Sequence, residues 1–266
     1  MANMNHLREP HPGPTIRCYD ELSLQLLRSD PTETTPRGFN SPHAIRPSNW
    51  PLSVHDTRIS DICKETADNS WPDWAVHLLP YIFCHAHTLF HPSHCYVLWI
   101  PSSATPPLHV AGYIVSTPNT NTFSTEWRRC YLPFLAQLSE GKTDGEYEWM
   151  QRFLTHDTYS NPETFLCDDA GIRERWPAHV HINLTVDWRG KGWGKKLIQV
   201  VFSKLKSERV RGVHLGVAAD NEGAVRFYEK CGLRREKEDK DTVWMVMDLW
   251  DETIRSAGAG ETLESK

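Results

Sequence analysis

The 266-residue sequence predicts an α/β fold in which helices flank a mixed β-sheet. Three observations point to this class: a strictly alternating stretch at 179–186, a helical stretch at 195–210, and a further strand–helix–strand succession from 212 to 250. Alternation of apolar and polar residues is typical of a strand with one buried face, and apolar residues three and four positions apart are typical of an amphipathic helix. We therefore expect one folded unit whose pattern is sharpest in its C-terminal half.

The chain divides into a folded unit and two less structured ends. Residues 1–43 are polar and proline-bearing, with a single apolar cluster "LSLQLL", and they predict a flexible N-terminal extension. Residues 44–250 carry the apolar patterns and form the expected domain, whereas 251–266 predict a disordered C-terminal tail.

The charge and the cysteine content argue against several classes of protein. The net charge is -5 and no run of Lys and Arg is longer than a pair, so we expect neither a nucleic-acid partner nor an anionic membrane. No segment has the length or apolar character of a membrane span or a signal peptide. The 7 cysteines are scattered without a C-x-x-C pair, which predicts reduced thiols and a cytoplasmic or nuclear location. The sequence leaves monomer and homodimer open.

The first half of the domain predicts a hairpin surrounded by helices. A short strand at 43–47 is expected to stop at Pro47, and a helix is expected at 56–66. The β-rich runs 95–100 and 108–116 are joined by a proline-rich turn, which predicts a hairpin. Two helices follow at 123–138, where Pro133 weakens the pattern, and at 144–154.

The second half alternates strands and helices. In the strand 179–186 one face is apolar and the other is polar; the faces hold Val180, Ile182, Leu184 and Val186, and His179, His181, Asn183 and Thr185. The helix 195–210 has a continuous apolar face, formed by Leu197, Ile198, Val201, Phe202 and Leu205. A strand at 212–217, a helix at 221–232 that Gly232 ends, and a last strand at 242–250 complete the order.

The stretch "DWRGKGWGKK" at 187–196 has the composition of an anion-binding turn. A glycine-rich turn between a strand and a helix exposes backbone N–H groups that have no helical partner, and the helix dipole adds positive charge there. Lys191, Lys195 and Lys196 crowd the same turn, which favours a phosphate group over a lone carboxylate.

Two common phosphate loops do not fit this turn. A nucleotide-hydrolase loop needs a hydroxyl residue directly after its lysine, whereas Lys196 follows Lys195. The dinucleotide loop needs the spacing G-x-G-x-x-G, whereas the glycines stand at 190, 192 and 194, and the following strand lacks the expected acidic residue. The pattern R-x-x-G-x-G at 189–194 remains, and it resembles the acetyl-CoA pyrophosphate loop of the GNAT superfamily of N-acetyltransferases.

A second motif supports this resemblance. The run "NEGAVRFYEKCGL" at 221–233 is similar to the GNAT pattern N-x-x-A-x-x-F-Y-x-x-x-G-F, with Leu233 in place of the final Phe. The resemblance implies a GNAT fold with a mixed, mostly antiparallel central sheet, splayed strands and flanking helices. It also implies transfer of the acetyl group of acetyl-CoA to a primary amine, on a small molecule or a protein lysine, by direct transfer in a ternary complex without a metal. The wider stretch 44–250 resembles the acetyltransferase-like domain of bacterial acetyltransferases and of O-GlcNAcase C-termini.

The resemblance assigns roles to individual residues. The strand before the loop binds the pantetheine arm through its backbone at Asn183, Leu184 and Thr185, and Tyr228 protonates the departing CoA thiolate. Asn221 bonds the pantetheine or caps the helix, two roles that can hold together, and Trp193 covers the cofactor. The residues assigned to cofactor binding are Asn183, Leu184, Thr185, Arg189, Gly190, Lys191, Gly192, Trp193, Gly194, Lys195, Asn221, Phe227 and Tyr228.

The proton acceptor is less well defined by the sequence. His179 and His181 share the polar face of the strand and have a suitable pKa, but two histidines on a half-buried strand are also typical structural residues. An Asp is frequent at the position of Asn183 in the O-GlcNAcase-like group, and an Asn cannot act as a base. This departure keeps a second hypothesis open, a pseudo-acetyltransferase that serves as a CoA-binding or interaction module.

The histidine-rich stretch "CHAHTLFHPSHC" at 84–95 suggests a metal site, but its spacing matches no zinc arrangement, and we expect none. We expect this stretch to form a wall of the acceptor cleft, together with residues 67–95 and 117–178. Acidic residues in the second segment could attract a cationic amine or simply form a solvated face; they include Asp168, Asp169 and Glu174.

Overall fold

The computed structural model describes residues 14–18, 54–67, 73–100, 110–139, 151, 154–155 and 160–250. The expected strand at 43–47, most of the expected helix at 144–154 and the tail 251–266 lie outside these described residues.

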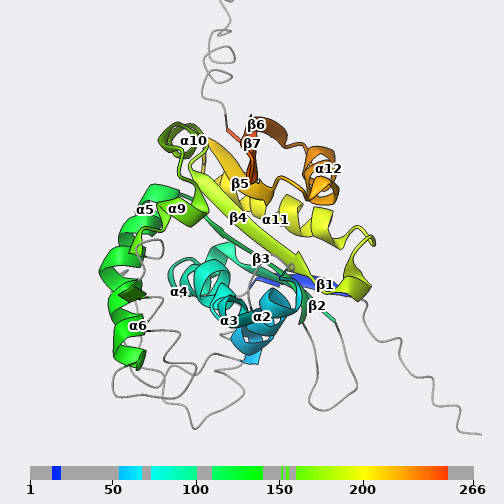
Figure 1. The fold of residues 1–266 in the computed structure, drawn as a ribbon. Coiled ribbons are helices and arrows are strands. Elements are labelled where there is room, and N and C mark those ends of the chain that lie inside the picture. Colours follow the sequence, from blue (N-terminus) through cyan, green and yellow to red (C-terminus); the bar gives the residue numbers. More distant parts are fainter. Residues whose placement is uncertain are drawn as a thin grey trace, which may run out of the picture.

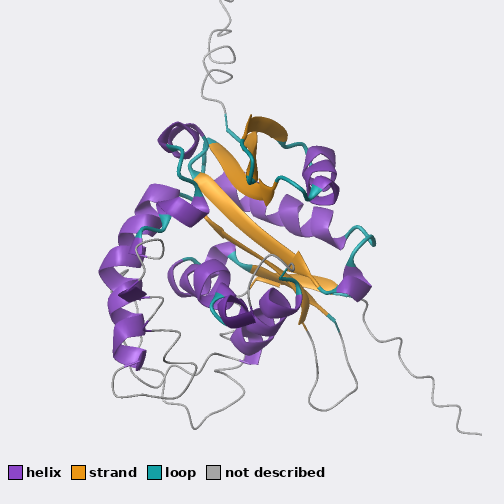
Figure 2. Ribbon diagram, viewed as in Figure 1, coloured by secondary structure: helices purple, strands orange, loops and turns teal. Residues whose placement is uncertain are grey.

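A seven-stranded sheet forms the centre of the described chain, in the order β1-β2-β3-β4-β5-β7-β6. Figure 2 shows the strands running between groups of helices. All neighbouring strands are antiparallel except β4 and β5, which are parallel. The strands are β1 (Thr15–Cys18), β2 (Tyr96–Trp99), β3 (Val110–Thr117), β4 (Ala178–Leu184), β5 (Gly212–Ala218), β6 (Arg234–Glu238) and β7 (Thr242–Asp248). This confirms the predicted mixed, mostly antiparallel sheet.

Helices cover both faces of the sheet (Figure 1). They comprise α2 (Val54–Glu65), α3 (Asp73–Val76), η1 (Tyr81–His85), α4 (Ala86–Phe90), η2 (Pro92–His94), α5 (Thr120–Glu126), η3 (Trp127–Tyr131), α6 (Leu132–Ser139), α9 (Glu163–Leu166), α10 (Ala170–Arg175), η4 (Val186–Trp188), α11 (Trp193–Ser207) and α12 (Glu222–Lys230). Helices α2 and α4 pack on β3 from one side, and α11 packs on β2, β3 and β4 from the other.

Alternation along β3 divides its side chains between two cores. Tyr113 and Val115 join the core beneath α2, η1 and η3, whereas Ile114 joins the core beneath α11. The apolar face predicted for the helix 195–210 is fully buried in this second core, which confirms that prediction. The strand is thus buried on both faces and holds the two halves of the domain together.

The predicted N-terminal extension contributes a strand, so the boundary at residue 44 is wrong for Thr15–Cys18. These four residues pair with β2 in antiparallel register, from Thr15 opposite Trp99 to Cys18 opposite Tyr96. The strand escaped prediction because four residues carry too little periodicity, and the pairing edge that stabilises them lies about eighty positions further along the chain.

The helix predicted at 123–138 is confirmed in an interrupted form. Asn119 caps its start by accepting a hydrogen bond from the Thr122 amide at 3.0 Å. The middle of the helix is a π-helical turn, η3, and Pro133 follows it at the second position of α6. Because proline cannot donate to the carbonyl four residues back, the interruption falls where the sequence pattern is weakest.

The strand β6 was not predicted. Its sequence "RREKE" is charged and exposed throughout, so it has no alternation to recognise. It forms because β7 offers an open edge, and charged side chains are usual on a strand that itself ends a sheet.

The strands β4 and β5 separate after two pairs of residues. Their register is limited to Ala178 opposite Val213 and His179 opposite His214, although both strands continue well beyond. The edge of β4 that faces β5 is therefore unpaired along most of its length. The expected strand 179–186 also ends earlier than predicted, at Leu184, and Val186 begins a 3-10 turn with its side chain 73% exposed.

Candidate active site

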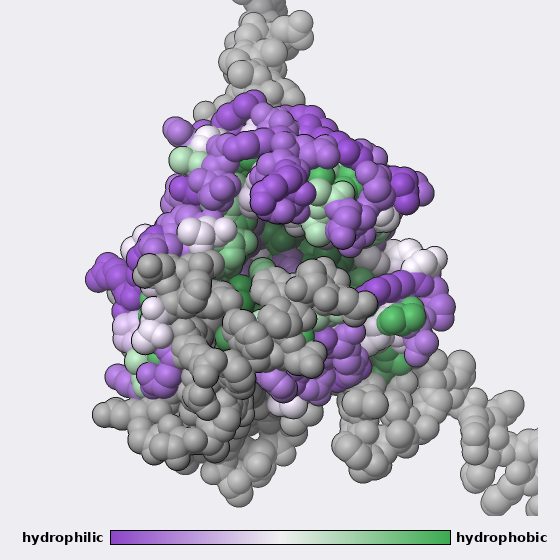
Figure 3. Space-filling model, viewed as in Figure 1, coloured by the Kyte–Doolittle hydropathy of each residue, from purple (hydrophilic) through white to green (hydrophobic). Residues whose placement is uncertain are grey.

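A cleft of about 1110 Å³ opens where β4 and β5 separate. The glycine-rich turn and α12 line one part of it, and α2 with the segment that contains η1 lines the other. In Figure 3 hydrophobic residues lie in the depth of this hollow, beneath a hydrophilic rim. All of the sequence-predicted site residues line the cleft except Thr185, Lys191 and Trp193.

The glycine-rich turn presents a row of free backbone amides. Gly190 and Gly192 adopt φ angles of 70° and 82°, which side chains with a Cβ rarely tolerate. Gly192 caps α11, whose first intrahelical bond comes from the Lys196 amide. Within the described chain the amides of residues 190–195 have no acceptor. The turn therefore has the donors and the helix-dipole field that bind a phosphate group.

The third glycine of the turn serves packing. A Cβ on Gly194 would lie 3.0 Å from Cζ of Phe227, so the absence of a side chain lets α12 approach the start of α11. Phe227, predicted as a cofactor-binding residue, lines the cleft and at the same time holds the two helices together.

The lysines of the turn point in different directions. Lys195 lines the cleft, whereas the Nζ atom of Lys196 lies 4.1 Å from the ring centre of Trp193. Lys191 lies over the ring of Trp188 at 5.3 Å. Trp193 is half-buried against the α11 core and does not line the cleft, so its predicted role as a cover for the cofactor is not supported.

Of the three residues predicted to bind the pantetheine arm through their backbone, only Leu184 turns its backbone groups to the unpaired edge of β4. The Thr185 amide donates to the Ala111 carbonyl on β3 at 2.9 Å. Since successive residues of a strand point their backbone groups to opposite edges, Asn183 and Thr185 bond toward β3 and Ile182 and Leu184 face the cleft. The prediction of Asn183 and Thr185 as backbone ligands is therefore corrected to Ile182 and Leu184. The Leu184 carbonyl already accepts from Nε of Arg189 at 2.9 Å, which leaves its amide available.

Tyr228 and Asn221 both line the cleft from α12. Burial raises the pKa of the Tyr228 phenol well above its usual range, so the hydroxyl stays neutral and can donate. In the described structure this hydroxyl has no hydrogen-bond partner. Asn221 caps α12 by accepting from the Ala224 amide at 3.0 Å, which confirms the capping alternative and leaves its Nδ2 donors free.

His179 is a structural residue, and its prediction as a general base is wrong. Its side chain is 4% exposed, with Nδ1 2.8 Å from the Thr120 hydroxyl and Nε2 2.8 Å from Nε2 of His87. The Thr120 hydroxyl donates to the Pro177 carbonyl, so its oxygen accepts from His179 and His87 supplies the other proton. Burial also holds the pKa of His179 well below its usual range.

His181 remains a candidate for the proton acceptor. It is partly exposed, lines the cleft and stacks on Phe83 at 4.8 Å between ring centres. Nδ2 of Asn183 lies 3.1 Å from Nε2 of His181 and 3.0 Å from the hydroxyl of Tyr113. Because an amide nitrogen is a donor, Asn183 keeps Nε2 of the neutral imidazole unprotonated. The substitution of Asn for a base at 183 thus orients a neighbouring base.

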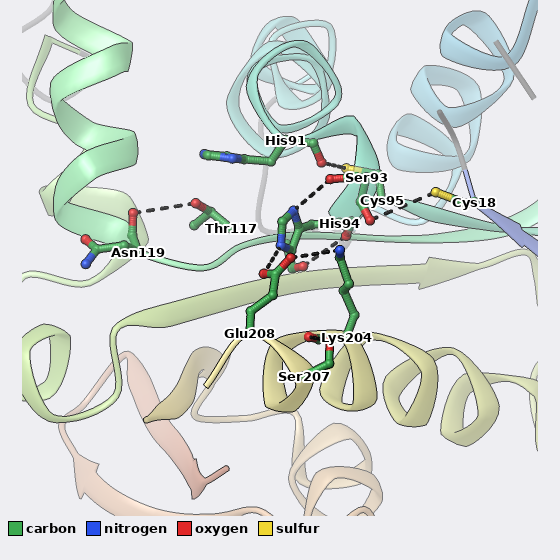
Figure 4. Close-up of polar contacts among 11 residues, drawn as sticks. Cys18, His91, Ser93, His94, Cys95, Thr117, Asn119, Lys204, Ser207 and Glu208 are labelled. Atoms are coloured by element: carbon green, nitrogen blue, oxygen red, sulfur yellow. Dashed lines mark hydrogen bonds and ion pairs between the residues drawn. The ribbon is translucent and has the colours of Figure 1, made fainter. Parts of the chain in front are cut away.

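Two histidines of the stretch 84–95 form hydrogen bonds with side chains of other helices. His85 bonds Ser60 at 2.8 Å, and His94 bonds Glu208 at 2.6 Å. Figure 4 shows Glu208 reaching from the end of α11 to His94 while Lys204 contacts the same carboxylate at 2.8 Å. Among the residues the structure describes, no three His, Cys, Asp or Glu side chains gather in a way that could hold a metal ion.

The acceptor side of the cleft is mostly apolar where the structure describes it. Its lining includes Cys63, Ala67, Leu79, Phe83, Phe165 and Leu166. The acidic residues proposed to attract an amine do not line it. Asp169 caps α10 and pairs with Lys237 at 2.8 Å, which favours the solvated-face alternative. Nothing in the sequence joined Cys63 or Phe83 to the site.

Comparisons with known proteins agree with this architecture. Residues 161–233 match the model of the acetyltransferase (GNAT) family. An uncharacterized N-acetyltransferase of Methanocaldococcus jannaschii, MJ1207, is 29% identical over 126 residues, which cover 46% of this chain and 51% of the relative. The chain therefore spans about half the length of this curated relative. The crystal structure of SsHAT has a TM-score of 0.62 at 20% identity, over 90% of this chain and 100% of that one.

The fold defined by this likeness is the GNAT fold, a mostly antiparallel sheet flanked by helices. The matched residues 161–233 contain the glycine-rich turn and the motif of α12. The family-model match, the relative MJ1207 and the fold shared with SsHAT support the GNAT acetyltransferase family for this chain. The finer relation to O-GlcNAcase C-termini stays a prediction.

In the part of the chain that the structure describes, no helix has the length and apolar character needed to cross a membrane.

Proposed function

We propose that the protein is an N-acetyltransferase that moves the acetyl group of acetyl-CoA to a primary amine by direct transfer in a ternary complex. One observation carries the proposal: the amides of residues 190–195, unpaired within the described chain, lie at the start of α11 beside the unpaired edge of β4. A diphosphate requires such donors, and an extended thiol-bearing arm can add to such an edge as a strand would.

Different residues of the cleft bind different parts of acetyl-CoA. The turn at 190–195 holds the diphosphate, with Lys195 adding its charge from the cleft wall. The backbone of Ile182 and the amide of Leu184 hold the pantetheine arm, and one such amide polarises the acetyl carbonyl. Bound acetyl-CoA supplies an activated acetyl thioester.

Proton transfer follows from two side chains on opposite sides of β4. Amine attack on a thioester requires a neutral amine, and His181 accepts the proton at Nε2 once the Asn183 amide, which occupies that lone pair in the free protein, gives way to the amine. The neutral hydroxyl of Tyr228 donates to the departing sulfur. The family match over both motifs and the N-acetyltransferase name of the archaeal relative support this activity.

Two measurements test the proposal. Acetyl-CoA at one hundred times its Kd is expected to stabilise the folded protein by about 2.7 kcal/mol, and the absence of any shift in the melting temperature would contradict cofactor binding. Release of CoA thiol is then followed with a panel of amines for the wild type and for Tyr228→Phe. We expect the variant to keep the melting shift and to lose roughly a hundredfold or more in kcat. A shift without turnover of any amine would favour the interaction module.

A further inference from the structure

Two cysteines lie together in the acceptor wall of the cleft. Cys63 on α2 and Cys84 on η1 are both buried in one core, where α2 packs against η1, and they are close enough for each thiol to shift the pKa of the other. Cys84 donates from Sγ to the Tyr113 hydroxyl at 3.2 Å, and the same hydroxyl accepts from Asn183 at 3.0 Å. Tyr113 and Asn183 therefore connect the two thiols to His181.

The surroundings of the two thiols are unequal. The neighbouring Cys84 and His181 hold the pKa of Cys63 well below its usual range, against the opposing effect of burial. Burial instead raises the pKa of Cys84. Of the two, Cys63 is therefore the cysteine that forms a thiolate more readily, which is the division of roles that thiol chemistry between two cysteines requires.

Cys63 and Cys84 differ in whether a molecule in the cleft can reach the sulfur atom. Cys63 is 3% exposed but lines the cleft, whereas Cys84 is fully buried behind it. Cys231 also lines the cleft, from α12, but burial raises its pKa and its thiol stays protonated. A small molecule that enters the cleft therefore meets the most readily ionised of these thiols at Cys63.

We propose that Cys63 is a modification site for peroxides and that Cys84 is its resolving cysteine. The Cys63 thiolate attacks one oxygen of hydrogen peroxide: an S–O bond forms, the O–O bond breaks, and hydroxide leaves. The Cys84 sulfur then attacks the Cys63 sulfenic acid: an S–S bond forms, the S–O bond breaks, and the Cys84 proton leaves with the hydroxyl group as water. The two thiols are oxidised by two electrons in total, and the peroxide is reduced.

The disulfide would change the acceptor side of the cleft. It would remove the Cys84 donor from Tyr113, the residue whose hydroxyl also positions Asn183 and, through it, His181. This consequence rests on the proposed acetyltransferase function. Oxidation is expected to lower acetyl transfer and to leave acetyl-CoA binding unchanged, because the glycine-rich turn and Tyr228 lie on the opposite side of the cleft.

The experiment uses the full-length reduced chain, hydrogen peroxide and dimedone, a reagent that traps sulfenic acids, with peptide mass spectrometry as the readout. We expect the wild type to yield a Cys63–Cys84 disulfide peptide that dithiothreitol removes. Cys84→Ser is expected to accumulate the dimedone adduct on Cys63, and Cys63→Ser to form neither product. Cys231→Ser is the matched control, a cleft cysteine whose loss should leave the disulfide yield unchanged.

A second measurement needs no variant and therefore does not depend on how the substitutions fold. At pH 6, where an ordinary thiol of pKa about 8.5 is under about 1% ionised, we expect iodoacetamide to alkylate Cys63 at least roughly tenfold faster than Cys231. Faster alkylation of Cys231 would overturn the proposal, as would a dimedone adduct on any cysteine other than Cys63. These readouts follow sulfur chemistry alone, so they succeed or fail independently of acetyl transfer.

Discussion

Phe227 of α12 lies so close to Gly194 of α11 that a Cβ on the glycine would stand 3.0 Å from the Cζ atom of the ring. The contact joins the helix that presents the free amides to the helix that carries Asn221 and Tyr228. The separation between the glycine-rich turn and the helix that carries Asn221 and Tyr228 is therefore set by a missing side chain.

Gly194→Ala is expected to displace Phe227 and to cost about 1–3 kcal/mol of unfolding free energy, as overpacking in a filled site usually does. Weaker binding of acetyl-CoA should accompany the loss. Gly223→Ala is the matched control, because Gly223 is also the second residue of a helix and its nearest atom, Oδ1 of Asn221, would lie 3.7 Å from a Cβ. Thermal melting measures both; equal melting temperatures would show that the contact has no energetic role.

Lys195 and Lys196 carry the same charge at two places, Lys195 in the cleft wall and Lys196 outside the cleft. Lys195→Gln should weaken acetyl-CoA binding by about 1.5 kcal/mol, roughly tenfold in Kd, because it removes a charged donor from the cleft wall. Lys196→Gln removes the same charge from a position over Trp193 and should leave the Kd within about twofold. Titration calorimetry compares the two, and an equal loss in both variants would mean that only net charge matters.

Two substitutions can separate the capping role of Asn221 from its proposed role in acetyl-CoA binding. Asn221→Ala removes the cap of α12 and should lower the unfolding free energy by about 1 kcal/mol. Asn221→Asp keeps the accepting oxygen and should retain stability, yet it replaces the Nδ2 donors with negative charge and should weaken acetyl-CoA binding. Wild-type affinity in the aspartate variant would leave Asn221 with the capping role alone.

Three buried histidines make the stability of the protein depend on pH. Burial holds the pKa values of His87 and His179 well below their usual range, and lowers that of His214 to about 4. Between an unfolded pKa of about 6.5 and these folded values, the unfolded chain binds more protons. The stabilisation is complete above pH 6.5 and is lost as the pH falls toward the folded pKa values, by up to about 1.4 kcal/mol per pH unit for each histidine.

Denaturant unfolding from pH 7.5 to 4.5 measures this slope. His214→Asn places an amide donor where Nδ1 now contacts the Trp176 carbonyl at 2.5 Å, and it removes one of the titrating groups. The variant should show a shallower loss of stability below pH 6.5 than the wild type. An unchanged slope would mean that His214 has the same proton affinity in the folded and unfolded chain.

Local patterns predicted much of the fold, because periodicity and glycine spacing are local properties of a chain. The strand β4, the apolar face of α11, the end of α12 at Gly232 and the turn at 190–194 followed from residues close together in the sequence. By contrast, β1 and β6 depend on partner strands, and a four-residue or fully charged segment carries no signal of its own.

The sequence by itself determined that a glycine-rich turn precedes an amphipathic helix and that Tyr228 and Asn221 share one helix. Only the tertiary structure decided the state of the histidines and thiols. His179 is confined by Thr120 and His87, and Cys63 is brought to His181, by packing between segments 59 to 118 residues apart. Hydrogen-bond partners, burial and pKa depend on which distant side chains meet, and no short-range pattern encodes that meeting.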